Sequence, residues 1–263
     1  MRILVQFPTR GRLEKFSKTL QLWQSNRLTN NVKFRIIIDR DDLSMNRPPV
    51  LNSLSQWGNL EVKLCEGHGK IHAINYGLAE ISKDYDIIVI ASDDMIPTGY
   101  GWDQRIIDDM YKHYPDGDGV LWYNDGYTAD RLNTLCILGT KYFRRFGYVY
   151  HPDYKSLWCD NEFMDVANML GKQTYFEDII IKHENPFNTG EKGDRLNFRD
   201  NQLFKLDERT YIRRKADNFG LIINSDTDST GETSTIGATT EPIKQPIGKP
   251  KRKRKGSDMP AIG

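Results

Sequence analysis

The segment from residue 84 to residue 97 constrains the fold more than any other part of the chain. Residues 87–91 form an uninterrupted apolar run, rich in β-branched side chains and bounded by polar groups. Such a run predicts a strand that is buried on both faces of a parallel sheet. It ends at Ser92-Asp93-Asp94, which places two carboxylates at the carboxyl end of the strand, where open α/β sheets bind their ligands. Because the two charges repel, we expect a divalent cation, Mg²⁺ or Mn²⁺, and with it a diphosphate.

The Asp93-Asp94 pair also has a simpler interpretation as ordinary surface charge. The chain contains two other such pairs, Asp41-Asp42 and Asp108-Asp109, and the latter lies in a helical pattern that is typical of a solvated helix face. Only Asp93-Asp94 directly follows a buried-strand pattern. The pair alone therefore leaves both interpretations open, and the rest of the chain must decide between them.

Three more apolar runs precede this segment and alternate with helical patterns. The runs cover residues 2–7, 34–38 and 60–64, and each is followed by a polar or glycine-rich loop: Pro8-Thr9-Arg10-Gly11-Arg12, Asp39-Arg40-Asp41-Asp42 and Glu66-Gly67-His68-Gly69-Lys70. Helical spacing follows the first and third loops, to about residue 25 and from residue 71 to residue 81. This alternation predicts a Rossmann-like α/β domain with a mostly parallel central sheet flanked by helices.

The second half of the chain continues in the same manner. We expect strands at about 119–123, 135–138, 172–176 and 179–182, and helices at about 106–113, 140–146, 158–170 and 198–218. The helix from residue 158 carries Asp160 and Glu162 in its first turn, and His183 follows the last expected strand. We therefore predict one domain over residues 1–220.

Residues 221–263 differ in composition from the preceding domain. A segment rich in Ser, Thr and Gly leads to Lys249-Pro250-Lys251-Arg252-Lys253-Arg254-Lys255. Because this segment has few large apolar side chains, we expect a disordered C-terminal tail with a basic cluster. The cluster either attracts a polyanion such as nucleic acid or serves only as a solubilising extension.

The cellular setting is predicted from what the sequence lacks. No apolar run approaches the roughly 18 residues of a membrane span, and the chain begins directly with a strand pattern rather than a signal peptide. Its three cysteines, at unrelated positions, suggest reduced thiols. We therefore expect a cytoplasmic protein.

Taken in their order and spacing, the motifs resemble the GT-A fold glycosyltransferases, and within them the family 2-like enzymes that use a nucleotide-diphospho-sugar. The resemblance covers about residues 3–190. Its pieces are Phe7-Pro8-Thr9-Arg10, Asp39, Gly69-Lys70, Ala73-x-Asn75-x-Gly77, Ser92-Asp93-Asp94, Asp160-Asn161-Glu162-Phe163 and His183. Ser92-Asp93-Asp94 corresponds to the DxD-type element of the family, with Ser92 in place of its first Asp.

The resemblance implies a role for each matching residue. Asp94 would ligate Mn²⁺ or Mg²⁺ together with His183, and Asp160 would be the catalytic base, with Glu162 as the alternative. Asp160 could instead serve only to cap its helix, since Asp is favoured at that position. The nucleotide-sugar would be bound by Pro8, Thr9, Arg10, Asp39, Lys70, Asn75, Ser92 and Asp93.

These roles predict a metal-dependent, inverting glycosyltransferase. It would move a sugar from a nucleotide-diphospho-sugar, in the first instance a UDP-sugar, to an unknown hydroxyl acceptor. The basic cluster suggests a polyanionic acceptor such as nucleic acid with hydroxylated bases. Two other functions remain open at this point: a nucleotidyltransferase, and a catalytically inactive nucleotide-sugar-binding module.

Overall fold

A computed structural model of the 263-residue chain describes residues 1–222, apart from the side chain of Phe187. The expected basic cluster, and all but the first two residues of the expected tail, lie outside the described residues. Leu221 is buried and packs with Val166 and Phe219. Leu221, the first residue of the expected tail, thus packs on α7 (Cys159–Met169).

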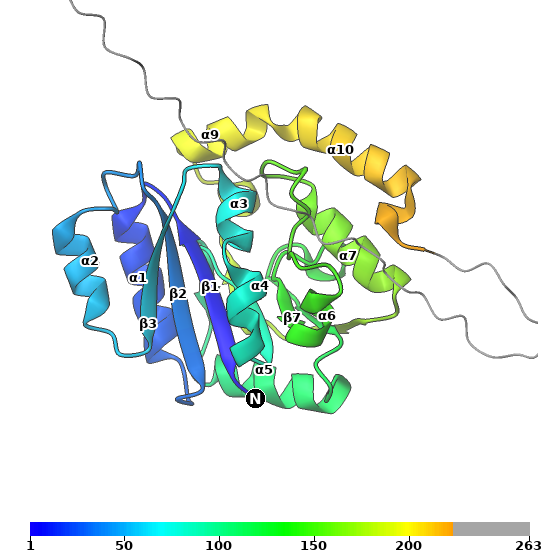
Figure 1. Cartoon of the computed structure of the whole chain (residues 1–263), viewed down its shortest axis with the longest axis horizontal. Helices are drawn as coiled ribbons and strands as arrows, with labels where there is room; N and C mark the ends of the chain where they lie inside the picture. The colour runs from blue at the N-terminus through cyan, green and yellow to red at the C-terminus, as the bar shows by residue number, and fades with distance from the viewer. Residues whose placement is uncertain (223–263) are drawn as a thin grey trace, which may run out of the picture.

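Strands and helices alternate through the first half of the chain (Figure 1). The strands are β1 (Ile3–Thr9), β2 (Val32–Asp39), β3 (Leu60–Cys65), β4 (Ile87–Ile90), β5 (Met95–Pro97), β6 (Val120–Tyr123), β7 (Ile137–Gly139), β8 (Gln173–Phe176) and β9 (Ile181–His183). The helices are α1 (Leu13–Ser25), α2 (Pro48–Ser55), α3 (Lys70–Asn75), α4 (Leu78–Ile81), α5 (Trp102–His113), α6 (Thr140–Arg144), α7 (Cys159–Met169), α8 (Pro186–Thr189), α9 (Arg195–Gln202) and α10 (Phe204–Ala216).

The central sheet has seven strands in the order β3-β2-β1-β4-β7-β6-β8. Every neighbouring pair is parallel except the two that β7 makes with β4 and β6. The chain runs outward from β1 through β2 to β3 and then returns to place β4 on the other side of β1. The strand order thus reverses between β1 and β4, and the carboxyl ends of these two strands are where open α/β sheets bind ligands.

Helices cover both faces of this sheet, as is usual for parallel sheets (Figure 1). Ile3, Val5 and Phe7 of β1 belong to a core cluster that includes side chains of α1, α2 and α5. Leu4, which points to the opposite face, belongs to a second cluster with side chains of α3, α4, α6 and α7. The predicted fold class is therefore confirmed.

The helix expected over residues 71–81 is divided into α3 and α4. Gly77 has a φ of 63°, in the left-handed region, and a Cβ at this position would lie 2.7 Å from the buried guanidinium of Arg35. That guanidinium donates a hydrogen bond to the carbonyl oxygen of Tyr76, which ends the first helix. A long-range contact with β2 therefore interrupts a continuous apolar pattern.

The last expected helix, at about 198–218, is also two helices, α9 and α10. Its start lies earlier than expected because Asp194 caps it: the Asp194 carboxylate accepts hydrogen bonds from the backbone N–H groups of Leu196 and Asn197, and the Asn197 side chain accepts from the N–H of Asp194. Figure 1 shows α9 and α10 lying across the end of the sheet at which β1 ends. Among the helices of residues 1–222, none is both long and apolar enough to cross a membrane.

Candidate functional site

The acidic turn Ser92-Asp93-Asp94 follows β4 and has a fixed backbone. The Thr19 hydroxyl of α1 donates to the carbonyl oxygen of Asp93 at 2.8 Å, and the Met95 N–H donates to the carbonyl oxygen of Ser92 at 3.1 Å. Both carboxylates are buried, Asp93 at 5% and Asp94 at 6% exposure. Two acidic groups are thus held next to each other with little access to water.

His183 lies beside Asp94 because of a two-stranded sheet that the sequence pattern did not predict. Strand β5, directly after the acidic turn, pairs with β9 in antiparallel register, with Met95 opposite His183. The Glu184 N–H then donates to the carbonyl oxygen of Asp94 at 2.7 Å. As a result, Nε2 of His183 is 3.6 Å from Oδ1 of Asp94, although 89 positions separate the two residues.

The two carboxylates of the turn differ in their electrostatic environment. Burial acts to raise the pKa of Asp94, but the nearby His183 and a hydrogen bond from the Ser92 hydroxyl outweigh it and lower that pKa. Burial raises the pKa of Asp93, although the Arg12 guanidinium, 3.1 Å from its Oδ1, acts in the opposite direction. Asp94 is therefore the carboxylate that its surroundings keep ionised.

The donor set at Asp94 fits a cation that shares its ligands with a substrate. Among residues 1–222, no three His, Cys, Asp or Glu side chains converge into a complete metal site. Asp94 and His183 nevertheless supply one oxygen and one nitrogen ligand, and Nδ1 of His183 is buried with no hydrogen-bond partner in the described part of the chain. Mg²⁺ is commonly held by one or two protein carboxylates, with phosphate oxygens and water completing its shell.

Lys70 and Asp160 lie near Asp94 and His183. Desolvation by the surrounding protein acts to lower the pKa of Lys70. The Cys159 thiol group and the carboxylates of Asp200, Asp160 and Asp94 outweigh this effect and raise the pKa. Burial raises the pKa of Asp160, while Lys70 and, more weakly, His183 act to lower it. Lys70 is exposed to solvent and Asp160 is half-buried, so both can meet a ligand.

The first turn of α7 uses its two acidic residues differently. Asp160 is not the N-cap, which is Trp158, but its Oδ1 accepts a hydrogen bond from the Asn161 N–H at 3.0 Å. Glu162 is buried and receives two hydrogen bonds of 2.7 Å from the Arg214 guanidinium and one of 2.8 Å from the Tyr154 hydroxyl. Glu162 therefore joins α7 to α10, whereas no side chain of residues 1–222 donates a hydrogen bond to the Asp160 carboxylate.

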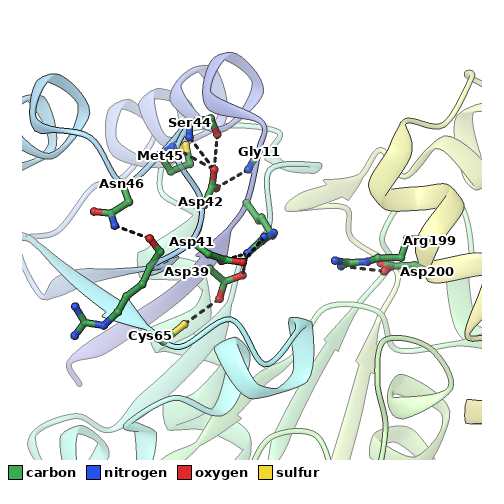
Figure 2. Close-up of polar contacts among 12 residues, drawn as sticks. Gly11, Asp39, Asp41, Asp42, Ser44, Met45, Asn46, Cys65, Arg199 and Asp200 are labelled. Atoms are coloured by element: carbon green, nitrogen blue, oxygen red, sulfur yellow. Dashed lines mark hydrogen bonds and ion pairs between the residues drawn. The ribbon is translucent and has the colours of Figure 1, made fainter. Parts of the chain in front are cut away.

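The expected nucleotide end of the site forms a second cluster (Figure 2). Arg10 donates to Oδ2 of Asp39 at 2.6 Å and to both oxygens of Asp41 at 2.6 and 3.0 Å. The Cys65 thiol donates to the other oxygen of Asp39 at 3.2 Å. Figure 2 shows Arg199, on α9, pointing toward this cluster from the opposite side. Asp39 and Arg10 thus lie together at the ends of β2 and β1.

Three of the residues predicted to bind the nucleotide-sugar, Pro8, Thr9 and Asn75, are part of the protein's own secondary structure or hydrogen-bond to its backbone. Pro8 and Thr9 are not in a loop but are the last residues of β1, paired with β2, and the buried Thr9 hydroxyl has no hydrogen-bond partner in residues 1–222. Asn75 donates to the carbonyl oxygen of Tyr150 at 2.7 Å and accepts from the Val149 N–H at 2.9 Å. The Asn75 amide therefore holds a neighbouring loop.

Arg12 is a central residue of the site that sequence reasoning missed. Its guanidinium contacts Asp93 and also pairs with both oxygens of Asp194 at 2.6 and 2.8 Å, and with the Asn197 side chain at 3.1 Å. The acidic turn is thereby tied to the first turn of α9. The available signal was the Asp194-x-x-Asn197 pattern of a helix start, but nothing local to it indicates Arg12 as a partner.

Comparison with known proteins supports the fold through structure alone. No family model matches this sequence, and no curated protein matches it. The structure is similar to S. aureus TarS 1-349 in complex with UDP-GlcNAc, with a TM-score of 0.56 and 12% identity over 75% of this chain and 61% of that one. It is also similar to the mannosyltransferase PcManGT from Pyrobaculum calidifontis in complex with GDP-Man and Mn²⁺, with a TM-score of 0.53 and 13% identity over 70% and 56% of the two chains.

These matches show that the chain has the fold of the GT-A glycosyltransferases, which confirms the resemblance seen in the sequence. The chain covers less than two thirds of the length of either protein. At this level of identity the likeness concerns the fold, and the activity has to be argued from the site itself.

Proposed function

We propose that this chain is a metal-dependent glycosyltransferase that moves a sugar from a nucleotide-diphospho-sugar to a hydroxyl acceptor with inversion at the anomeric carbon. One observation carries the proposal: Nε2 of His183 lies 3.6 Å from Oδ1 of Asp94 beyond the carboxyl end of β4, and Lys70 and Asp160, from two further segments, lie near enough for Lys70 to act to lower the pKa of both carboxylates. Transfer from a diphosphate donor can use each of these groups: the ammonium group of Lys70, the two carboxylates and the imidazole.

The donor would lie along the carboxyl ends of β2, β1 and β4. Asp39, a buried acceptor at the end of β2, would bind the base or the ribose once Arg10 turns from it to the nucleotide. Lys70 would bind the diphosphate as a point charge, and Asp93 the sugar or the ribose. We take the nucleotide to be UDP. The structures of TarS and PcManGT contain UDP-GlcNAc and GDP-Man, so sugars of both nucleotides belong in the test.

Direct displacement needs one base for the acceptor proton and no nucleophile from the protein. Asp160 is suited to this role, because burial raises its pKa and its carboxylate accepts hydrogen bonds only from backbone N–H groups in residues 1–222. Asp94 and His183 would hold Mn²⁺ or Mg²⁺, which when bound offsets the charge that develops on the departing diphosphate. Glu162 is already occupied by Arg214, which favours Asp160 as the base.

The acceptor class rests on sequence alone. The basic cluster at residues 249–255 suggests a polyanion, such as nucleic acid with hydroxylated bases. This segment lies outside the described residues.

Donor hydrolysis tests the proposed reaction without knowledge of the acceptor. Purified protein is incubated with Mn²⁺ and a panel of nucleotide-sugars, and the released nucleotide is identified. We expect slow release of a nucleoside diphosphate, which EDTA abolishes. In a parallel reaction with a nucleoside triphosphate and a sugar 1-phosphate, release of pyrophosphate would instead indicate a nucleotidyltransferase. Binding of a nucleotide-sugar without any release would indicate an inactive binding module.

A further inference from the structure

Helix α10 contributes a carboxylate that is buried completely and is bonded to backbone only. Asp207 has no exposed surface. It accepts hydrogen bonds from three consecutive N–H groups, those of Lys155 at 2.9 Å and of Ser156 and Leu157 at 2.8 Å each. Three aligned donors compensate a buried negative charge without a cation. A residue 50 positions away thus determines the backbone of the segment 155–157.

The segment 155–157 leads directly into α7 through a strained residue. Trp158, the N-cap of α7, has a φ of 64°, in the left-handed region that large side chains rarely adopt. Its ring lies 5.5 Å from that of Phe204 and 5.1 Å from that of Tyr211, both on α10. Such a conformation persists only where its surroundings hold it. Helix α10 supplies that support on both sides, with Asp207 on the backbone and two aromatic rings on the side chain.

The same segment contacts one residue of the proposed site and lies directly before another in the sequence. The carbonyl oxygen of Ser156 accepts a hydrogen bond from Nζ of Lys70 at 3.5 Å. Asp160 follows Trp158 by two positions, so the path of the backbone at residue 158 sets the direction of the Asp160 carboxylate. A displacement of residues 155–157 would therefore move both the cation expected at the diphosphate and the expected base.

We infer that Asp207 is a positioning residue for the transfer reaction: its carboxylate holds residues 155–157 and thereby places Lys70 and Asp160. This inference rests on the proposed function. Asp207 touches no reacting atom in this arrangement and acts through the backbone. A carboxylate is needed because Asn has one acceptor oxygen, and its NH₂ group would face N–H donors.

The test compares Asp207→Asn with a matched variant on the same helix interface. Asp165 of α7 accepts hydrogen bonds from Tyr211 and Lys215 of α10 and does not touch residues 155–157. Asp165→Asn therefore weakens the contact between α7 and α10 without releasing the segment. Asp207→Glu restores the charge with one extra methylene. Each variant is examined by amide hydrogen exchange and by transfer or donor-hydrolysis kinetics in the full chain.

We expect Asp207→Asn to lose exchange protection at the amides of residues 155–157 and to lower kcat about 10²-fold, as displacements of about 1 Å do. Binding of the base and ribose at the Asp39 end, measured with uridine, should persist. Asp207→Glu should recover part of the kcat, and Asp165→Asn should keep wild-type kcat and protection. Unchanged kcat in a variant whose segment has lost protection would overturn the inference, and so would equal losses of kcat in Asp207→Asn and Asp165→Asn.

The exchange measurement separates this inference from the proposed function. If the wild-type protein releases no nucleotide from any donor, the proposed transferase activity fails, and the role of Asp207 in that reaction fails with it. The exchange data then still decide whether Asp207 holds the segment. If Asp207→Asn does not fold, Asp207→Glu is compared with Asp165→Asn in the same two measurements. Wild-type kcat together with an unchanged exchange pattern in Asp207→Glu would then show that the exact position of the carboxylate is not needed.

Discussion

Asp160→Asn should abolish most of the activity and leave the protein at least as stable at neutral pH. The substituted amide still accepts the hydrogen bond from the Asn161 N–H, so the first turn of α7 is preserved. It cannot take a proton from an acceptor hydroxyl. Transfer should therefore fall about 10²-fold or more, the usual scale of general-base catalysis.

The stability effect follows from the raised pKa of Asp160, whose main cause is burial. As the pH rises above the ordinary value of 3.8, the unfolded chain ionises first and the folded state retains its proton longer. Stability is therefore lost between that value and the raised pKa, by about 1.4 kcal/mol for each pKa unit between them. Asn has no charge to bury, so the variant escapes this loss.

Glu162→Gln should have the opposite signature. The carboxylate is 6% exposed and its partner Arg214 11% exposed, and two contacts of 2.7 Å join them. Removing one member of such a buried ion pair costs about 3 kcal/mol, because the other charge is left buried. For a chain of this size that loss lowers Tm by about 6 to 12 °C. Any loss of transfer should be smaller than in Asp160→Asn.

Urea unfolding over a pH series, together with a transfer assay, measures both effects. The difference in unfolding free energy between Asp160→Asn and the wild type should grow with pH above 3.8 and vanish below it. Normal transfer by Asp160→Asn would refute the assignment and move the base to Glu162. A loss of stability in Asp160→Asn at pH 7 would show that the carboxylate serves the helix instead.

The remaining predictions concern the metal and the C-terminal segment. Asp94→Asn should abolish turnover and Mn²⁺-dependent donor binding, while circular dichroism shows an intact fold. His183→Ala should weaken the use of Mn²⁺ less severely. Near-normal activity of Asp94→Asn in EDTA-treated buffer would exclude the metal site. Deletion of residues 222–263 should leave donor hydrolysis unchanged, because every proposed site residue precedes it. With a nucleic-acid acceptor, the deletion should raise the KM for acceptor and reduce its salt dependence, and no change in either would remove that segment from the mechanism.

The sequence predicted the sheet because its signals are local. The runs that became β1, β2 and β4 are almost wholly buried, and such runs stand out along the chain without knowledge of their neighbours, whereas β3 is buried only at Leu60 and Cys65. The polar residues that follow them had to meet, since parallel strands bring their carboxyl ends to one edge. Asp94 could therefore be singled out from the residues themselves, and the resemblance added Asp39 and Lys70.

The tertiary structure decided which of the two acidic residues in the first turn of α7 is held in an ion pair. Asp160 and Glu162 share one helical turn and one residue chemistry, and no local pattern distinguishes them. The distinction comes from Arg214, 52 positions later, which occupies Glu162. The Arg12 contact with Asp194 spans 182 positions and the Asp207 contacts about 50. Periodicity along the chain records which face of an element is buried, whereas a hydrogen bond between distant segments depends on how the elements pack, so only the folded chain could specify these partners.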